Sequence, residues 1–540
     1  MSNSRTTAGT GVTISGGHRG LIEGTFFAER FGAKIMSFDS FGEEHKARLR
    51  RYRTFWRFYK GLHWDWNRGG GGDSESEPLV TMNYCKRLVD VQVNFLMKKG
   101  WDITIPDDPE TPEAEAETRK FVKVKLDKIW KRNRKRLLSF ELAQSGSVTG
   151  DTFVRVYWKN SGRFGSHAAM EVIPSHLCFP EYGGGEEGID RKQLIRLEIA
   201  WPRFEEVVKM TFLGRKKHKT LVMYREVWTP EFREFWREDE MISRTANWAA
   251  PNIPVVHIKN YPTVGESYGV SDLHTVVELQ RSVNETQTDI QDVVQYHGSP
   301  VTVLSGAKIS QLERGANRVW SIPETASVAN LELAGDLAAS HRFMDSQRDA
   351  IFELSGVPRA AFGGAEAGGA SSGVALAMKF LPLLEQRDVK IETYGEGLEE
   401  LNYLLLLATE SKDAAFRKQF QALPEETRYQ TEISFPPPLP RDVMLELDAA
   451  RTRLELGLST RKMELEKMGH GDMSADEILK RVDAERVELA QAEFNVGQML
   501  PGGGPSPKPA SGNPNPRRPN PDQQGEAVSR RAEVEDEQGV

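Results

Sequence analysis

One short segment of the sequence has the spacing of a hydrolase nucleophile. Gly369–Gly373 reads Gly-Ala-Ser-Ser-Gly and fits G-x-S-x-G, the pattern in which the central serine attacks an acyl group. That chemistry requires a buried strand leading into a sharp turn. Residues 363–369 are instead Gly-Gly-Ala-Glu-Ala-Gly-Gly, which the interior of a strand would not tolerate. The pattern favours a glycine loop with a mechanical role, and a serine hydrolase built on Ser371 remains an alternative.

Patterns typical of nucleotide and metal sites are absent from the sequence. No G-x-x-x-x-G-K-[ST] phosphate loop occurs, so no ATPase site is expected. The eleven histidines include no H-E-x-x-H pair. Cys85 and Cys178 form no C-x-x-C pair, and their apolar neighbours predict two buried, unpaired thiols. The sequence therefore predicts a protein that is not an enzyme and has no cofactor and no metal ion.

Composition limits the class of protein. With 540 residues the chain should form several domains or layers, and 39% hydrophobic residues suffice for globular folding. No apolar run reaches the roughly 18 residues of a membrane span, and residues 1–20 have no apolar segment typical of a secretory signal. The formal net charge of −7 argues against a general nucleic-acid binder. We expect a cytoplasmic setting without a membrane.

Residues 36–268 have the pattern of an α+β domain. The capping box Ser40–Glu43 opens a helix predicted over Phe41–Phe58, and a second helix is predicted over Asn83–Lys99. Runs of β-branched and aromatic residues then predict strands at "DTFVRVYW", "MEVIPSHLCF", "LIRLEIAW", "TLVMYREVWT" and "PVVHIK".

Between these helices and strands lies a strongly basic segment, Arg119–Arg136. Val122, Leu126, Ile129 and Trp130 form an apolar stripe along it, which predicts one helix. Its charges indicate either a solvated helix face or a patch for nucleic acid or an acidic partner. The solvated face is the favoured interpretation.

A helix–strand–helix unit follows. A long helix is predicted over Val270–His297, then short strands at "PVTVLSG", "RVWSIP" and "VANLELAG", then a helix over Leu337–Ser355. This order predicts a projection of two helices that carries a small head. The polar side of the first helix is rich in Gln, Asn and Thr, which favours packing beside copies of itself.

The last third of the chain is predicted to be helical up to a disordered tail. A long helix over Val374–Thr409 contains Pro382, which should kink it. Three helical segments are predicted within Val443–Phe494. From Gly497 the Pro, Gly, Asn and Gln content indicates disorder.

The order of these pieces resembles the portal proteins of tailed bacteriophages, closest to those of phages with long, flexible tails. The resemblance covers about residues 40–495 and depends on several motifs taken in order: "RRYRTFWRFYKGLH", "VTMNYCKRLVDVQVNFLMKKGWDI", "SVTGDTFVRVYW", "VVHIKNYPTVGESYGVSDLHTVVELQRSVNETQTDIQDVVQYHGSPVTVLSG" and "GLSTRKMELEKM". The glycine content of the loop and the basic segment are not features that the resemblance covers.

The resemblance implies a set of parts. They are a disordered arm (1–35), a wing (36–268), a first stem helix (269–297), a clip (298–336), a second stem helix (337–356), a tunnel loop (357–373), a kinked spine helix with a wing strand (374–442), a crown (443–496) and a disordered tail (497–540). It also implies a homo-oligomeric ring, usually of about twelve subunits, at one capsid vertex of the virion. Assembly would take place in the host cytoplasm.

The tunnel loop would line a channel for double-stranded DNA during packaging and ejection. Its expected contact residues are Ala361, Phe362, Gly363, Gly364, Ala365, Glu366, Ala367, Gly368, Gly369, Ser371 and Ser372. Residues 360–373 include one charged residue and no cation, and lysine and arginine contacts to phosphates dominate nucleic-acid affinity. A loop without cations would let DNA slide, and its glycines would let it change conformation.

The clip would be a docking surface for other proteins. Arg and Trp are favoured at interface hot spots, so the expected residues are Lys308, Arg314, Arg318 and Trp320. The implied partners are the terminase large subunit, the major capsid or scaffolding protein and a head–tail adaptor. Packing between subunits of the ring is an equally good use for the same clip residues. A third hypothesis for the whole chain is a DNA-binding protein that uses the basic segment 119–136.

Overall fold

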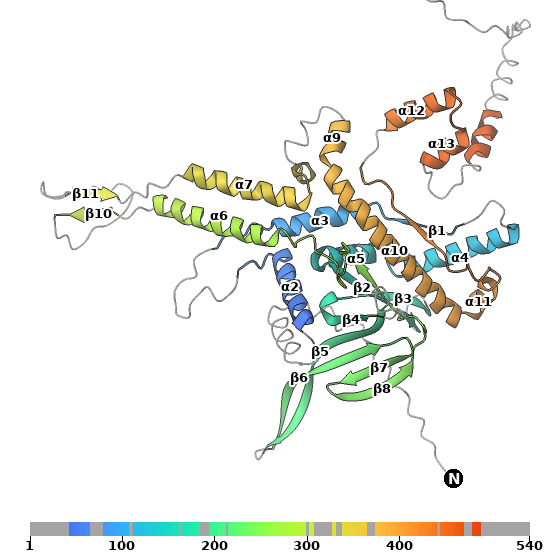
Figure 1. Cartoon of the computed structure of the whole chain (residues 1–540), viewed down its shortest axis with the longest axis horizontal. Helices are drawn as coiled ribbons and strands as arrows, with labels where there is room; N and C mark the ends of the chain where they lie inside the picture. Colours follow the sequence, from blue (N-terminus) through green and yellow to red (C-terminus); the bar gives the residue numbers. More distant parts are fainter. Residues whose placement is uncertain are drawn as a thin grey trace, which may run out of the picture. The chain divides into compact units, whose positions relative to one another are not determined.

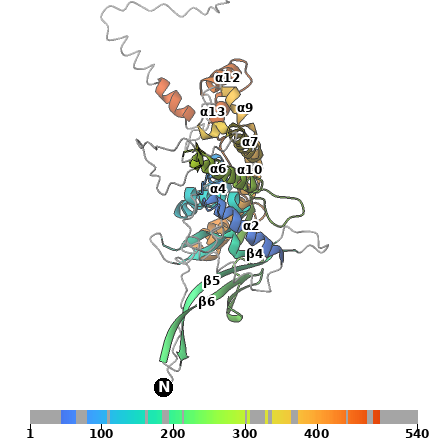
Figure 2. The same ribbon diagram turned by 90° about the vertical axis from the view of Figure 1, so that its left-hand side faces the viewer.

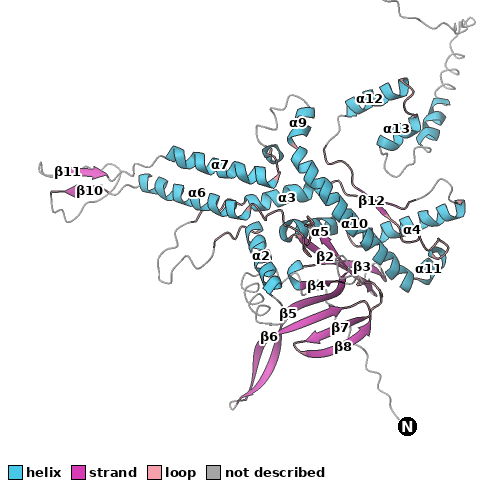
Figure 3. Ribbon diagram, viewed as in Figure 1, coloured by secondary structure: helices cyan, strands magenta, loops and turns pink. Residues whose placement is uncertain are grey.

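The computed structural model describes residues 43–64, 79–106, 112–160, 165–183, 194–211, 214–298, 302–306, 327–330, 337–363, 373–439, 443–468 and 478–487. Close contacts divide the chain into two units, Met1–Pro440 and Arg441–Val540. All the strands of the described ranges lie in the first unit, where they alternate with helices, and this mixture confirms the α+β class (Figure 3). None of the helices in these ranges is both long enough and apolar enough to cross a bilayer.

A three-stranded antiparallel sheet lies at the centre of the first unit, in the order β3-β2-β9. β2 (Asp151–Lys159) pairs with β3 (His167–Ile173) along one edge and with β9 (Val255–Lys259) along the other. Successive residues of a strand point to opposite faces. In β2, Phe153 joins one apolar cluster and Val154 joins another, so the sheet is buried on both faces.

A layer of helices covers one face of this sheet. α5 (Lys135–Thr149) leads directly into β2, α3 (Tyr84–Met97) packs against α5, and α10 (Leu381–Lys412) crosses the sheet (Figure 1). Their buried side chains and those of the sheet form the largest apolar cluster described, with Trp130 and Tyr394 among its fully buried members.

The opposite face contacts a five-stranded antiparallel sheet in the order β4-β5-β6-β7-β8. Its strands are β4 (Cys178–Tyr182), β5 (Leu194–Thr211), β6 (Gly214–Trp228), β7 (Phe232–Arg237) and β8 (Glu240–Ala246). The β5–β6 hairpin projects beyond the other strands (Figures 1 and 2). β7 and β8 have no counterpart among the predicted strands, because β8 is exposed along its whole length and lacks an apolar alternation.

The run "MEVIPSHLCF", predicted as one strand, divides between β3 and β4. Pro174 is followed by a 3-10 turn at Ser175–Leu177, and the chain then enters the other sheet. The prediction of a single strand is therefore wrong, because proline removes the backbone donor that a continuing central strand needs.

The basic segment is two helices, not the single helix predicted over 119–136. α4 (Glu113–Arg132) ends at Asn133, and α5 begins at Lys135. Between them Arg134 has a φ of 58° and a ψ of 56°, a left-handed conformation that ends a helix. The predicted apolar stripe is confirmed, because its four residues are all buried. The N-terminal helix α2 (Glu43–Tyr59) is also confirmed.

The predicted helix–strand–helix unit is present. α6 (Val277–Gly298) packs along α7 (Leu337–Ser355), and β10 (Thr302–Ser305) pairs with β11 (Ser327–Asn330) beyond their ends (Figure 1). α6 is shorter than predicted at its N-terminus, where residues 272–276 form turns.

The polar stripe of α6 is used within the chain. Gln280, Asn284 and Thr288 lie one turn apart and are buried. They accept hydrogen bonds of 2.8–3.2 Å from backbone amides of residues 80–84. The prediction that this stripe packs beside copies of the chain is therefore wrong for these three residues.

The helix predicted over Val374–Thr409 is interrupted. α9 (Gly373–Lys379) ends before Phe380, and α10 begins at Leu381. Pro382 thus lies in the first turn of α10, where a missing amide hydrogen costs no helical hydrogen bond. The chain therefore forms two helices that meet just before the proline, and the predicted kink within one helix is wrong. A short strand after α10, β12 (Glu432–Ser434), pairs with β1 (Asp102–Thr104) and so ties the end of the first unit to its beginning.

The second unit has helices α12 (Val443–Glu455) and α13 (Arg461–Met468) and a helical segment at 478–487. The Arg453 guanidinium forms a 2.7 Å ion pair with Glu464 that joins α12 to α13. Three helical segments are confirmed in this part of the chain.

Candidate functional site

Only the start of the predicted DNA-contacting loop lies within the described residues. Ala361, Phe362 and Gly363 are described, whereas Gly364–Ser372, with Ser371, fall outside. The four predicted docking residues, Lys308, Arg314, Arg318 and Trp320, also fall outside the described ranges.

The chain enters this loop through a short 3-10 helix, Arg359–Phe362. The ring of Phe362 packs against that of Phe352 on α7, with ring centroids 5.2 Å apart, and the Arg87 guanidinium lies 5.7 Å from the Phe362 ring. Phe362 is half-buried by these contacts. Gly363 then has a φ of 79° and open space around its Cα, so the chain leaves the helix by a left-handed turn.

The chain leaves the loop onto the same group of side chains. Phe380 stacks on Phe95 of α3, and Leu383 of α10 is buried in one apolar cluster with residues of the helix before the loop. This cluster contains buried residues from α3, α6, α7 and α10 and from the residues next to α6 and α7: Leu88, Val276, Val283, Ile351, Val357 and Leu383. Both ends of the loop are therefore anchored at the base of the α6–α7 pair.

A buried ion pair fastens α10 to the segment that precedes α6. The Lys390 ammonium is 2.7 Å and 2.9 Å from the two carboxylate oxygens of Asp272 and 2.6 Å from the Gln92 amide oxygen of α3. The Lys390 and Asp272 side chains are 3% and 0% exposed. Burial lowers the pKa of Lys390, and Asp272 opposes that shift. The Asp272 carboxylate offsets the desolvation cost of burying the Lys390 ammonium.

Asn260 extends the same network. Its amide nitrogen donates to Asp272 at 2.7 Å, and its amide oxygen accepts from the buried Tyr394 hydroxyl at 3.2 Å. The end of β9 and the entry to α6 are thus held at one point with the middle of α10, which is more than 100 residues further along the chain.

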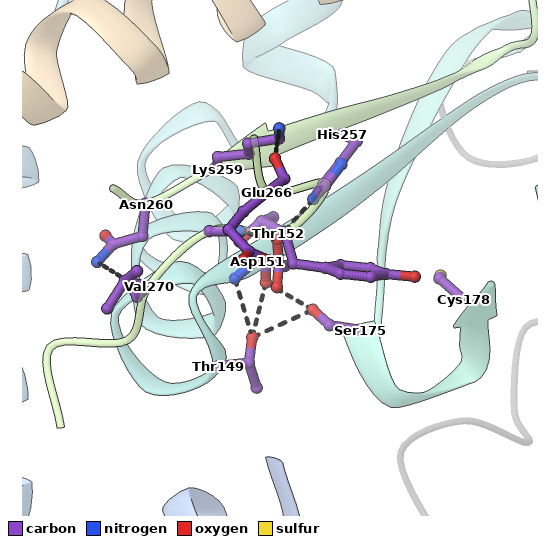
Figure 4. A network of polar contacts seen from close by, with 12 residues as sticks. Thr149, Asp151, Thr152, Ser175, Cys178, His257, Lys259, Asn260, Glu266 and Val270 are labelled. Carbon is purple, nitrogen blue, oxygen red and sulfur yellow. Dashed lines mark hydrogen bonds and ion pairs between the residues drawn. The ribbon is translucent and has the colours of Figure 1, made fainter. Parts of the chain in front are cut away.

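A second network surrounds Asp151, at the start of β2 (Figure 4). The Asp151 carboxylate accepts hydrogen bonds from His257 at 2.7 Å, from the Gly269 amide at 2.8 Å and from the Tyr52 hydroxyl. Its backbone oxygen accepts from the hydroxyls of Thr149 and Ser175 at 2.7 Å and 2.6 Å. A carboxylate this deep requires such donors, and here its three described donors come from α2, from β9 and from the segment before α6.

Asp151 and His257 resemble two members of a catalytic triad, but their contacts do not fit that role. Burial lowers the pKa of His257, which favours a neutral ring that donates to Asp151 and accepts from the Tyr182 hydroxyl. A second G-x-S-x-G match, Gly265–Gly269, contains Ser267 in the turn region after β9, and no hydrogen bond joins Ser267 to His257 among the described residues. The hydrogen bonds of Asp151 and His257 therefore hold α2, β2, β9 and the segment before α6 together.

The sequence contains one signal for the first of these networks. Leu383, Arg387, Lys390, Tyr394 and Leu398 recur at helical spacing and are all buried on α10. A lysine on such a stripe requires a buried acidic partner. The identity of that partner, Asp272, is not visible from local spacing.

Taken together, the described residues define an α+β protein with a projecting pair of helices. Buried ionic and polar contacts join the segment before α6 to α10 and β9. The residues on both sides of the loop pack into the apolar cluster at the base of α6 and α7. No group of three or more His, Cys, Asp or Glu side chains among the described residues is arranged to hold a metal ion. The buried contacts can hold α6, α10 and β9 in fixed positions relative to one another.

A family model described as "Phage portal protein, SPP1 Gp6-like" matches residues 40–491. The match covers most of the chain, and the protein belongs to this phage portal family. No curated protein matches the sequence.

Proposed function

We propose that the chain is the subunit of a portal ring at one capsid vertex, through which double-stranded DNA enters during packaging and leaves during ejection. The observation that carries this proposal is the family match over residues 40–491. In this proposal residues 36–268 are the wing, α6 and α7 are the stem, and residues 298–336 are the clip. Residues 357–373 form the tunnel loop, residues 374–442 the spine helix and wing strand, and residues 443–496 the crown.

The anchoring of the loop supports its assignment to the channel. Both ends are held by the cluster at the base of α6 and α7, which fixes the points where such a loop begins and ends. Residues 364–372 are Gly, Ala, Ser and one Glu, without a cation that would hold phosphates. Such a loop would contact DNA through weak steric contacts and would let it slide.

The clip in this proposal is the docking surface for the terminase and later for the head–tail adaptor. Lys308, Arg314, Arg318 and Trp320 lie between β10 and β11 in the sequence, so docking would take place beyond the far ends of α6 and α7. The protein would be structural, and the motor that consumes ATP would be the terminase.

The first test is the mass and shape of the purified protein. Native mass spectrometry should give about 730 kDa, corresponding to about twelve copies of the 60.8 kDa chain. Negative-stain electron microscopy should show a ring with a central hole. A species that stays monomeric at all concentrations, even with its scaffolding protein, would contradict the proposal.

The second test concerns the loop glycines. Replacing Gly363, Gly364, Gly368 and Gly369 with leucine should leave the ring intact and lower DNA packaging about tenfold, because bulky residues restrict the loop and narrow the channel. Packaging would be measured in vitro with purified terminase. The same replacements in the glycine run Gly69–Gly72 serve as the control and should package normally. Normal packaging by the loop variant would show that residues 357–373 do not line the channel.

A further inference from the structure

The outward face of α10 is an exposed acidic surface. Glu385, Glu392, Glu396 and Glu400 lie three to four residues apart or at multiples of that spacing, opposite the buried stripe of the helix, and all are exposed. Val389 lies among them and is 45% exposed. At about 1.5 Å per residue, this acidic face is roughly 22 Å long.

This acidic face lacks neutralising partners in the described part of its own subunit. None of its four glutamates forms an ion pair with another described residue. Burial and the nearby Glu396 carboxylate raise the pKa of Glu400 to about 7, and burial and the carboxylates of Glu432, Glu396 and Glu392 raise the pKa of the adjacent Glu399. Like charges that crowd on one helix face destabilise it unless a cationic surface approaches.

An exposed basic surface of similar length lies on α4 and the α4–α5 corner. Lys120, Lys123, Lys128 and Lys131 are exposed on the side of α4 away from the core, and Arg134 continues the surface at the corner. Glu117 and Asp127 are exposed on the same side, so the surface is basic in its net charge. No ion pair with a described residue is formed by any of these five cations. Lys120 to Lys131 spans roughly 17 Å.

Two features set this basic face apart from an ordinary solvated helix. The helix dipole accounts for cations in the last turn of α4, such as Lys131, but not for Lys120 and Lys123 in its middle. Apolar side chains are also exposed between the charges, with Val124 50% and Phe121 38% exposed. A mixture of cations and apolar groups fits a protein surface better than a nucleic acid, because phosphates do not cover apolar groups.

We propose that these two faces bind each other between neighbouring copies of the chain: the acidic face of α10 on one subunit contacts the basic face of α4 on the next. The faces match in sign, in length and in having exposed apolar residues among their charges. Two different surfaces of one chain that pair in this way form a head-to-tail contact, which closes into a ring when the rotation permits. This inference rests on the proposed ring, and it assigns the acidic face of α10 on a neighbouring subunit as the partner of the basic segment.

The test is a charge swap. The first variant carries Glu392→Lys and Glu396→Lys, and the second carries Lys128→Glu and Lys131→Glu. Each should raise the concentration needed for half-maximal ring assembly at least tenfold, because two like-charged contacts replace two attractive ones at every junction and the changed face loses most of its net charge. Assembly would be followed by sedimentation velocity and native mass spectrometry at low salt.

Mixing the two variants provides the decisive arm. In a mixed ring the α10 of the first variant, which carries the new lysines, contacts the α4 of the second, which carries the new glutamates. At the other junctions the unchanged acidic α10 of the second variant contacts the unchanged basic α4 of the first. An equal mixture should therefore assemble within about threefold of the wild-type concentration. Rescue of this kind also shows that both variants are folded. The matched control, Glu425→Lys with Glu426→Lys on an exposed turn, has the same change in charge and should assemble as the wild type does.

The outcomes separate this inference from the proposed function. If the wild type forms rings and each variant alone does so equally well, the pairing of these two faces is wrong and the ring remains. If the variants fail alone and also fail when mixed, the pairing is wrong as well. If the wild type forms no ring under any condition, the proposed function itself fails.

Discussion

Replacing Lys390 with methionine is expected to lower the free energy of unfolding by about 3–5 kcal/mol. Methionine retains most of the side-chain volume but removes the ammonium that both carboxylate oxygens of Asp272 contact at 2.7 Å and 2.9 Å. The Asp272 side chain is fully buried, so its charge would remain in the protein interior with one neutral side-chain donor among the described residues, Asn260. Among the described residues, the Gln92 amide oxygen would also lose its hydrogen-bond donor. Urea unfolding followed by circular dichroism measures the loss.

Two companion variants isolate the buried pair. Lys86→Met removes an ammonium from an exposed i,i+4 pair with Asp90 and should cost at most about 1 kcal/mol, because solvent screens that interaction. Adding Asp272→Asn to Lys390→Met should recover at least about 1 kcal/mol, since asparagine has no charge and can still accept from Asn260. A Lys390→Met variant as stable as Lys86→Met would contradict the buried pair.

Replacing Gly269 with alanine is expected to destabilise the protein by about 3 kcal/mol. A Cβ atom at this position would lie 2.2 Å from the Gly150 carbonyl oxygen and 3.0 Å from the Asn260 amide nitrogen. Both contacts are to backbone atoms, so no side-chain rotation can relieve them. The strand β2 and the segment entering α6 would have to separate. That movement would strain the 2.8 Å hydrogen bond from the Gly269 amide to Asp151.

Gly395→Ala is the matched control for this substitution. Gly395 lies within α10, and a Cβ atom added there would contact nothing within 4 Å. Alanine should therefore stabilise the helix by about 0.5–1 kcal/mol, because glycine loses more backbone entropy on folding. The midpoint urea concentration of unfolding should fall for Gly269→Ala and rise for Gly395→Ala. A shift in the same direction and of similar size would show that β2 and the segment before α6 do not approach each other this closely.

The sequence alone determined those features that depend on short-range spacing. The helix predicted over Leu337–Ser355 is α7 with the same bounds, and the run "DTFVRVYW" is β2. Helical periodicity and β-branched runs report local conformation directly, because each element mostly satisfies its own backbone or alternates its faces within a few residues. The order of the motifs also sufficed to identify the portal family, which the family match confirms.

The tertiary structure alone decided how these elements hold one another. Gln280 and Asn284 are polar residues of a long helix, and their spacing does not indicate their partners; in the structure they bind the backbone of residues 80–84, about 200 positions away. The break at Arg134 and the pairing of Lys390 with Asp272 likewise depend on contacts between distant segments. A polar side chain has the same letter whether it faces water or a buried partner, and only the packed chain determines which of the two it meets.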